Sequence, residues 1–180
     1  MNLPRVTDVI AAAGLGPDLS RARPEDVAAG RARGSAVHAA CEGLVYGYLD
    51  EATLSPEVAP YVSAFRKFLA ESRFEPIRAE YRVEHPVWRY CGHPDLLGFL
   101  TGLRTIVDVK TGDDTGAKYQ VSAYCDAHTA QYPDEPVLHG AILHLRDDGT
   151  FRLDPVSLVA ALPVFRAALV VFNARKELGR

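Results

Sequence analysis

The sequence predicts an α/β fold, in which a single domain contains a central mixed β-sheet flanked by α-helices. Some segments repeat their apolar residues every three or four positions, as amphipathic helices do, and others alternate apolar with polar residues, as half-buried strands do. These segments follow one another as helices, three strands, a helix, two strands and a helix, an order that suits layered α/β packing. The 180 residues, 48% of them apolar, suffice for one core and are few for two.

The helical segments show the clearest repeat of apolar residues. We expect helices at residues 7–13 with Thr7 as cap, from Pro24 or Gly34 to Leu49, at 57–72, at 116–130, and in a C-terminal segment that Asp154-Pro155 opens. Pro163 then starts or kinks the second half of that last segment. A connection rich in Gly, Pro and Arg, residues 14–30, follows the first helix.

The strands are expected where the period changes to two. Residues 77–83 alternate apolar and charged side chains, which predicts one half-buried strand. Residues 90–100 and 103–111 form a pair turned at Thr101-Gly102, and 137–145 and 150–153 form a further hairpin. We therefore divide the single domain into an N-terminal helix and loop (1–33), a core (34–153) and a C-terminal helical segment (154–180).

Composition narrows the class of protein. The net charge of −3 shows no general basic character, so a nucleic-acid partner would have to bind local clusters of arginine. Three widely spaced cysteines without a CxxC pair argue against a zinc ribbon, an iron–sulfur cluster or a disulfide scaffold. No signal peptide is recognisable, and Pro163 and Arg166 interrupt the most apolar stretch. We expect a soluble cytoplasmic protein that does not bind membranes.

Asp108 and Lys110 are the first candidate site residues. Residues two apart on a strand project to the same face, so both side chains can enter one pocket while Val109 points into the core. The carboxylate of Asp108 and the carbonyl of Val109 are hard oxygen donors that suit Mg²⁺ or Mn²⁺. Taken alone, the pair is better explained as a surface ion pair.

Asp95 and His38 add two further metal-ligating side chains. Asp95 stands in a Gly92-His-Pro-Asp segment at the start of an apolar run, where a buried carboxylate needs a partner; the alternative is a turn-capping aspartate. His38 lies on the long helix with Glu42 four residues later, on the same face; the alternative is a surface or core histidine.

Gln120 and Tyr124 are one helical turn apart on the helix that follows the Asp108 strand. An amide and a phenol on one face can bind phosphate, water or a base, although an exposed glutamine and a half-buried tyrosine would look the same in the sequence.

Together these residues resemble the RecB-like branch, with its phage-type exonucleases, of the PD-(D/E)XK nuclease superfamily. The matching elements, within about residues 31–130, are Gly34-x-x-x-His38, the strand around Glu80, Gly92-x-x-Asp95, Asp108-x-Lys110 and Gln120-x-x-x-Tyr124. Asp108 stands where glutamate is common, and the iron–sulfur cysteines of some relatives are absent.

The resemblance implies a restriction-endonuclease-like core with Mg²⁺ or Mn²⁺ held by His38, Asp95, Asp108 and the Val109 carbonyl, and no iron–sulfur cluster. Lys110, Asp95 and Asp108 would be catalytic, Gln120 and Tyr124 would assist at the substrate, and the roles of Glu42 and Glu80 stay open.

The expected function is that of a metal-dependent deoxyribonuclease, an exonuclease acting on DNA in phage or bacterial recombination and repair, with a recombinase or annealing protein as a natural partner. Three alternatives remain: a non-catalytic nucleic-acid-binding or assembly subunit, a structure-specific or sequence-specific endonuclease, and a plain structural protein. The sequence does not indicate the polarity of digestion, a preference for single- or double-stranded DNA, activity on RNA or the oligomeric state.

Overall fold

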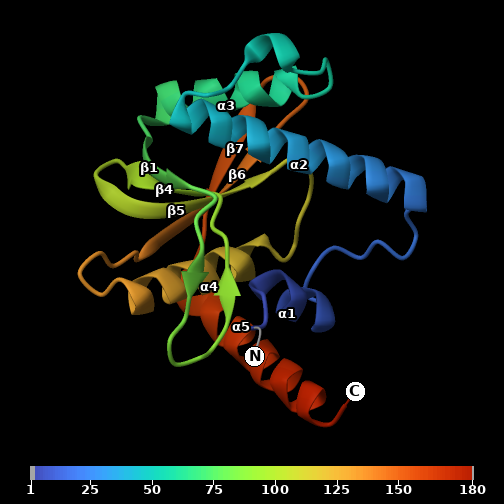
Figure 1. Cartoon of the computed structure of the whole chain (residues 1–180), viewed down its shortest axis with the longest axis vertical. Coiled ribbons are helices and arrows are strands. Elements are labelled where there is room, and N and C mark those ends of the chain that lie inside the picture. Colours follow the sequence, from blue (N-terminus) through green and yellow to red (C-terminus); the bar gives the residue numbers. More distant parts are fainter. Residues whose placement is uncertain (1–2, 180) are drawn as a thin grey trace.

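The computed structural model describes residues 3–179 and consists of three layers, with a β-sheet between two layers of helices (Figure 1). The helices are α1 (Val6–Ala12), α2 (Pro24–Tyr46), the 3₁₀ helix η1 (Glu51–Thr53), α3 (Ala59–Ser72), α4 (Ala117–Gln131) and α5 (Leu158–Glu177). The strands are β1 (Glu75–Ala79), β2 (Val83–Glu84), β3 (Cys91–Gly92), β4 (Leu96–Leu100), β5 (Leu103–Lys110), β6 (His139–Leu145) and β7 (Phe151–Pro155). The expected α/β class, with one compact domain and a mixed sheet flanked by helices, is confirmed.

The central sheet has five strands in the order β1-β4-β5-β6-β7. Only β5 and β6 run parallel, joined by the crossover through α4, and the other neighbours are antiparallel. Most of β5 is buried, as expected for a middle strand covered on both faces. The β4–β5 turn has positive φ at both Thr101 and Gly102, which matches the twist of a two-residue hairpin.

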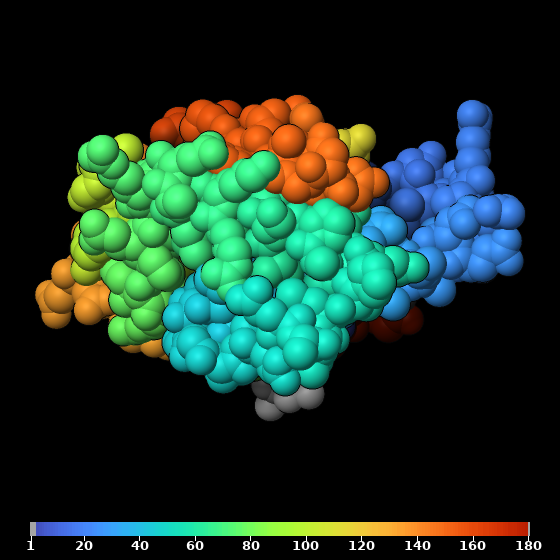
Figure 2. Space-filling view, turned by 90° about the horizontal axis from the view of Figure 1, so that it is seen from above, coloured from blue at the N-terminus to red at the C-terminus, as the bar shows by residue number. Residues whose placement is uncertain are grey.

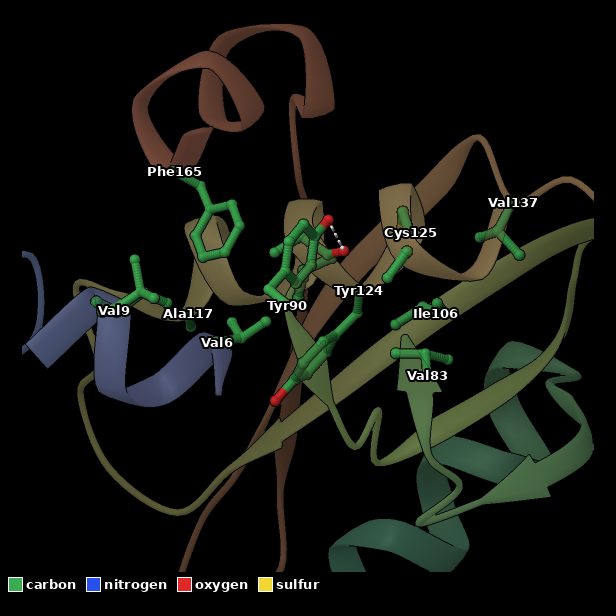
Figure 3. Packing of buried hydrophobic residues seen from close by; sticks show 14 of the residues in the cluster. Val6, Val9, Val83, Tyr90, Ile106, Ala117, Tyr124, Cys125, Val137 and Phe165 are labelled. Atoms are coloured by element: carbon green, nitrogen blue, oxygen red, sulfur yellow. Dashed lines mark hydrogen bonds between the residues drawn. The ribbon is translucent and has the colours of Figure 1, made fainter. Parts of the chain in front are cut away.

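Two apolar cores cover the two faces of this sheet. α2 and α3 pack on one face through residues such as Val37, Phe65 and Phe68. α1, α4 and α5 pack on the other through residues such as Val6, Val121 and Phe165, part of which Figure 3 shows. The first turns of α2 stand away from the body, at the blue end of the space-filling view (Figure 2).

The predicted strand at residues 77–83 is wrong. β1 ends at Ala79, Glu80 takes a left-handed conformation with φ 47°, and the chain then enters β2, which pairs with β3 in a separate two-stranded sheet. Ile77, expected on the buried face, is 43% exposed. Alternation in the sequence cannot reveal this break, because the residues on both sides of it keep the same period.

The observed helix boundaries differ from the expected ones by smaller amounts. α1 begins at Val6 after Arg5, so Thr7 is not its cap. α2 begins at Pro24, where proline is favoured in the first turn, and ends at Tyr46; the following Gly47 has a φ of 76°, which suits a glycine after a helix. Asp154 and Pro155 belong to β7, and α5 is one helix from Leu158 with Pro163 inside it.

α5 has the length and composition of a membrane-spanning helix, with a mean hydropathy of 1.6 over its most apolar window. In this fold it packs on α4 through the buried residues Ala161, Phe165 and Leu169, and Arg166 forms an ion pair with Asp126. Of this apolar window 17% is buried, and a single helix that meets these criteria by length and composition is weak evidence for a membrane span.

Candidate metal centre

The candidate site lies where β4 begins and β5 ends. These strands are antiparallel neighbours, with Leu96 opposite Val107, so Asp95 lies beside the last residues of β5. The backbone amide of Val109 donates a hydrogen bond of 2.6 Å to Oδ2 of Asp95. The topology therefore brings Asp95 next to Asp108 and Lys110, although the sequence separates them by more than a dozen residues.

His38 approaches the same place from α2. Its Nδ1 lies 3.2 Å from Oδ1 of Asp95 and 3.3 Å from Oε1 of Glu80. Within residues 3–179, these three side chains form a group whose potential ligand atoms all lie within 4.8 Å of one another. A single imidazole nitrogen thus sits between two carboxylates, one just after β1 and the other just before β4.

Glu80 lies in the candidate site, although its position in the sequence predicts an exposed side chain. The alternating pattern puts it on an exposed face, whereas the left-handed turn at Glu80 ends β1 beside the start of β4. Its backbone amide donates to the carbonyl of Asp95 at 3.0 Å, which fixes the two residues together. The only sequence signal for it was its place in the resemblance, because no periodicity predicts a positive φ at glutamate.

Asp108 is fully buried and poorly satisfied. Its Oδ2 lies 2.6 Å from Nζ of Lys110, and its Oδ1 has no hydrogen-bond partner among residues 3–179. Burial raises the pKa of Asp108 to about 7, although the ammonium of Lys110 opposes this rise. A buried carboxylate oxygen without a partner is costly, and a cation would satisfy it.

Lys110 is held by three groups. Besides Asp108, its Nζ donates to Oε1 of Gln120 at 3.2 Å and lies 3.7 Å from Oδ2 of Asp114. Burial opposes the charged form, but Asp108 and Asp95 outweigh it and raise the pKa of Lys110 above its ordinary value. The side chain therefore stays an ammonium ion across the physiological pH range.

Tyr124 completes a hydrogen-bonded chain that leads to Lys110. Nε2 of Gln120 donates to the hydroxyl oxygen of Tyr124 at 2.9 Å. Tyr124 is buried rather than half-buried, and its hydroxyl points out of the apolar cluster around it (Figure 3). Its ring packs so closely on Gly92 that a Cβ there would lie 2.2 Å from Cε1 of Tyr124, so β3 needs a glycine at this position.

The donor set fits a divalent cation. One imidazole and the carboxylates of Glu80 and Asp95 form this group, and the predicted ligand Asp108 lies outside it, paired with Lys110 on β5. Oxygen-rich sites with one nitrogen suit Mn²⁺ as well as Mg²⁺. Burial opposes protonation of His38, yet Asp95 and Glu80 raise its pKa to about 10. Two acids beside one imidazole thus create a strong preference for positive charge at this point.

The remaining predicted residues lie around this cluster. Val109 buries its side chain in the core beneath α2, as expected. Glu42 lines, with Gly34, Ser35, His38 and Glu80, an open cleft of about 450 Å³, so His38 and Glu80 can be reached from it.

Comparison with known proteins adds little to this geometry. No family model matches the chain, and no curated protein does. A solved structure described as "Crystal Structure of LHK-Exo in complex with dAMP" is 13% identical, over 98% of this chain and 93% of that one, with a TM-score of 0.39. A similarity this low carries no argument, so the functional interpretation depends on the side chains themselves.

Proposed function

We propose that this protein is a Mg²⁺- or Mn²⁺-dependent deoxyribonuclease, and specifically an exonuclease of the RecB-like type. One observation carries the proposal: a buried, unsatisfied carboxylate, Asp108, is paired with Lys110 and lies beside the His38–Asp95–Glu80 cluster. Carboxylates that can ligate a cation beside a charged lysine suit hydrolysis of a phosphodiester, in which negative charge builds up on the phosphate.

The proposed metal ligands are His38, Glu80, Asp95 and Asp108, with the carbonyl of Val109 as a further donor. A divalent cation held there lowers the pKa of water and neutralises charge on phosphate oxygens. The Val109 amide keeps Asp95 oriented, since it donates to the oxygen that His38 does not contact.

Lys110 supplies a fixed positive charge in this mechanism. Because its pKa is raised, it is a poor general base, and it acts instead by donating hydrogen bonds to the phosphate as charge develops. Gln120 holds the ammonium from one side, and Tyr124 holds Gln120. In this proposal Gln120 and Tyr124 therefore act chiefly by positioning Lys110.

A cytoplasmic role in recombination or repair, with a recombinase or annealing protein as partner, follows from this activity and is part of the proposal. The direct test uses linear and closed circular DNA, each single- and double-stranded, incubated with Mg²⁺, Mn²⁺ or EDTA, and sizes the products.

We expect linear DNA to be degraded to short products with either metal, and closed circles to survive. Cleavage of closed circles would show that the protein is an endonuclease, because closed circles have no ends for an exonuclease to attack. DNA binding without any product, in the presence of metal, would make the protein a non-catalytic subunit.

A further inference from the structure

Tyr46 is an exposed tyrosine at the very end of α2. It is the last residue of the helix before Gly47, and half of its surface is accessible. It lies eight residues after His38 on the same helix. Nothing in the sequence gives this side chain a role, and a tyrosine at a helix end is ordinarily a surface residue.

The hydroxyl of Tyr46 nevertheless makes two hydrogen bonds to one buried residue of β1. It donates to the carbonyl of Ala79 at 3.0 Å and accepts from the amide of Ala79 at 2.9 Å. β1 is an edge strand, and in the described part of the chain β4 is its one neighbour. A tyrosine hydroxyl is both donor and acceptor, so it replaces a neighbouring strand at this residue.

Glu80 follows Ala79 directly, in the left-handed conformation with φ 47°. Such a conformation is unfavourable for a residue with a side chain and persists only where its surroundings hold it. On one side, the amide of Glu80 is bonded to the Asp95 carbonyl at 3.0 Å. On the other side, Ala79 is fixed by Tyr46. The carboxylate of Glu80 reaches His38 from this braced turn.

We propose that Tyr46 is a positioning residue of the metal centre, which aims the Glu80 carboxylate at the bound cation by fixing the backbone of Ala79. α2 thus supplies one ligand directly, through His38, and orients a second through Tyr46. The inference rests on the proposed metal site and adds to it a residue that does not touch the metal.

A merely structural role for Tyr46, as cover for the sheet edge, makes a different prediction. In that case loss of the hydroxyl lowers thermal stability and leaves metal affinity unchanged. The decisive variant is Tyr46→Phe, which removes only the hydroxyl. Tyr48→Phe is the matched control, because Tyr48 stacks on Tyr46 at a centroid distance of 6.4 Å and is also exposed, whereas the two hydrogen bonds to Ala79 come from Tyr46.

The measurement is calorimetric titration of each folded protein with Mn²⁺ alone, without DNA, supported by thermal melts in EDTA. We expect Tyr46→Phe to weaken Mn²⁺ binding by about 10-fold or more, as when a residue that orients a ligand is lost, and Tyr48→Phe to bind as wild type does. Unchanged affinity in Tyr46→Phe, with or without a lower melting temperature, overturns the inference.

A second pair of variants asks whether Tyr46 acts through Glu80. When Glu80→Gln is already present, adding Tyr46→Phe should weaken Mn²⁺ binding no further, because the two residues belong to one unit. An equal loss in both backgrounds overturns the inference. Wild-type protein that binds no Mn²⁺ overturns the metal site and this inference together, whereas wild-type binding with an unaffected Tyr46→Phe variant overturns the role of Tyr46 alone.

Discussion

Nζ of Lys110 lies 2.6 Å from Oδ2 of Asp108, two residues earlier on the same strand. Strand geometry places both side chains on one face, and burial makes each the principal neutralising partner of the other. A pair that close and that buried is costly to break, and evolution commonly keeps such charges for chemistry rather than for stability.

Replacing Lys110 by alanine should lower the rate of DNA degradation by about 100- to 1000-fold or more, because a fixed charge at the phosphate is lost. Mn²⁺ binding should persist, since the ligands remain. Initial rates on linear duplex DNA measure the effect. The control is Lys118→Ala, which removes an exposed ammonium lying over the Tyr119 ring on α4. A Lys110→Ala variant as active as wild type would remove Lys110 from the mechanism.

Asp95→Asn should weaken Mn²⁺ binding by more than about 100-fold, which exceeds the usual effect of removing a residue that only orients a ligand. The amide oxygen can still accept from Val109, so the fold should survive. Titration calorimetry measures the affinity, and Asp113→Asn, an exposed acid near the site, is the control. Equal affinity in Asp95→Asn and wild type would exclude Asp95 as a ligand.

The metal-free protein should lose stability as the pH rises. The pKa of His38 is about 10 in the folded protein and 6.5 ordinarily, so its stabilising effect is complete below about pH 6.5 and disappears as the pH rises through about 10. Asp108 has the same sign: its pKa rises from 3.8 to about 7, so its contribution is lost across that interval.

Urea unfolding in EDTA, at several pH values between about 6 and 9, tests this dependence. We expect the free energy of unfolding to decrease with pH, and the decrease above about pH 7 to be shallower in His38→Gln. A His38→Gln variant with the same slope as wild type would show that His38 is not the titrating group.

Gly92→Ala should destabilise the fold by about 1–3 kcal/mol, because the new methyl group overlaps the Tyr124 ring. The displaced ring also moves the partner of Gln120, so activity should fall as well. Thermal melts and DNA degradation measure both effects. Gly112→Ala, where the added Cβ meets no atom within 4 Å and φ is not positive, should change stability by less than about 0.5 kcal/mol. Equal stabilities of the two variants would contradict the close approach.

The sequence by itself determined most of the elements and suggested a chemistry for the site. Helical and alternating periods are local properties, so they located α2, α3, α4 and β5 to within a few residues. The strand expected at residues 90–100 was wrong in its first half, because the structure divides it between β3 in the two-stranded sheet and β4 in the central sheet. The residue types at 38, 95, 108 and 110 were sufficient to suggest a cation and a phosphodiester, because few other groups combine an imidazole, two acids and a lysine.

Only the tertiary structure decided which of these residues meet, and how. The left-handed turn at Glu80 splits the expected strand and brings this acid to His38. The amide of Glu80 donates to the Asp95 carbonyl, and the preceding Ala79 is bonded to the Tyr46 hydroxyl. Both partners are distant in the sequence. At Glu80 the unfavourable backbone conformation is flanked by long-range hydrogen bonds, and no local pattern in the sequence records them.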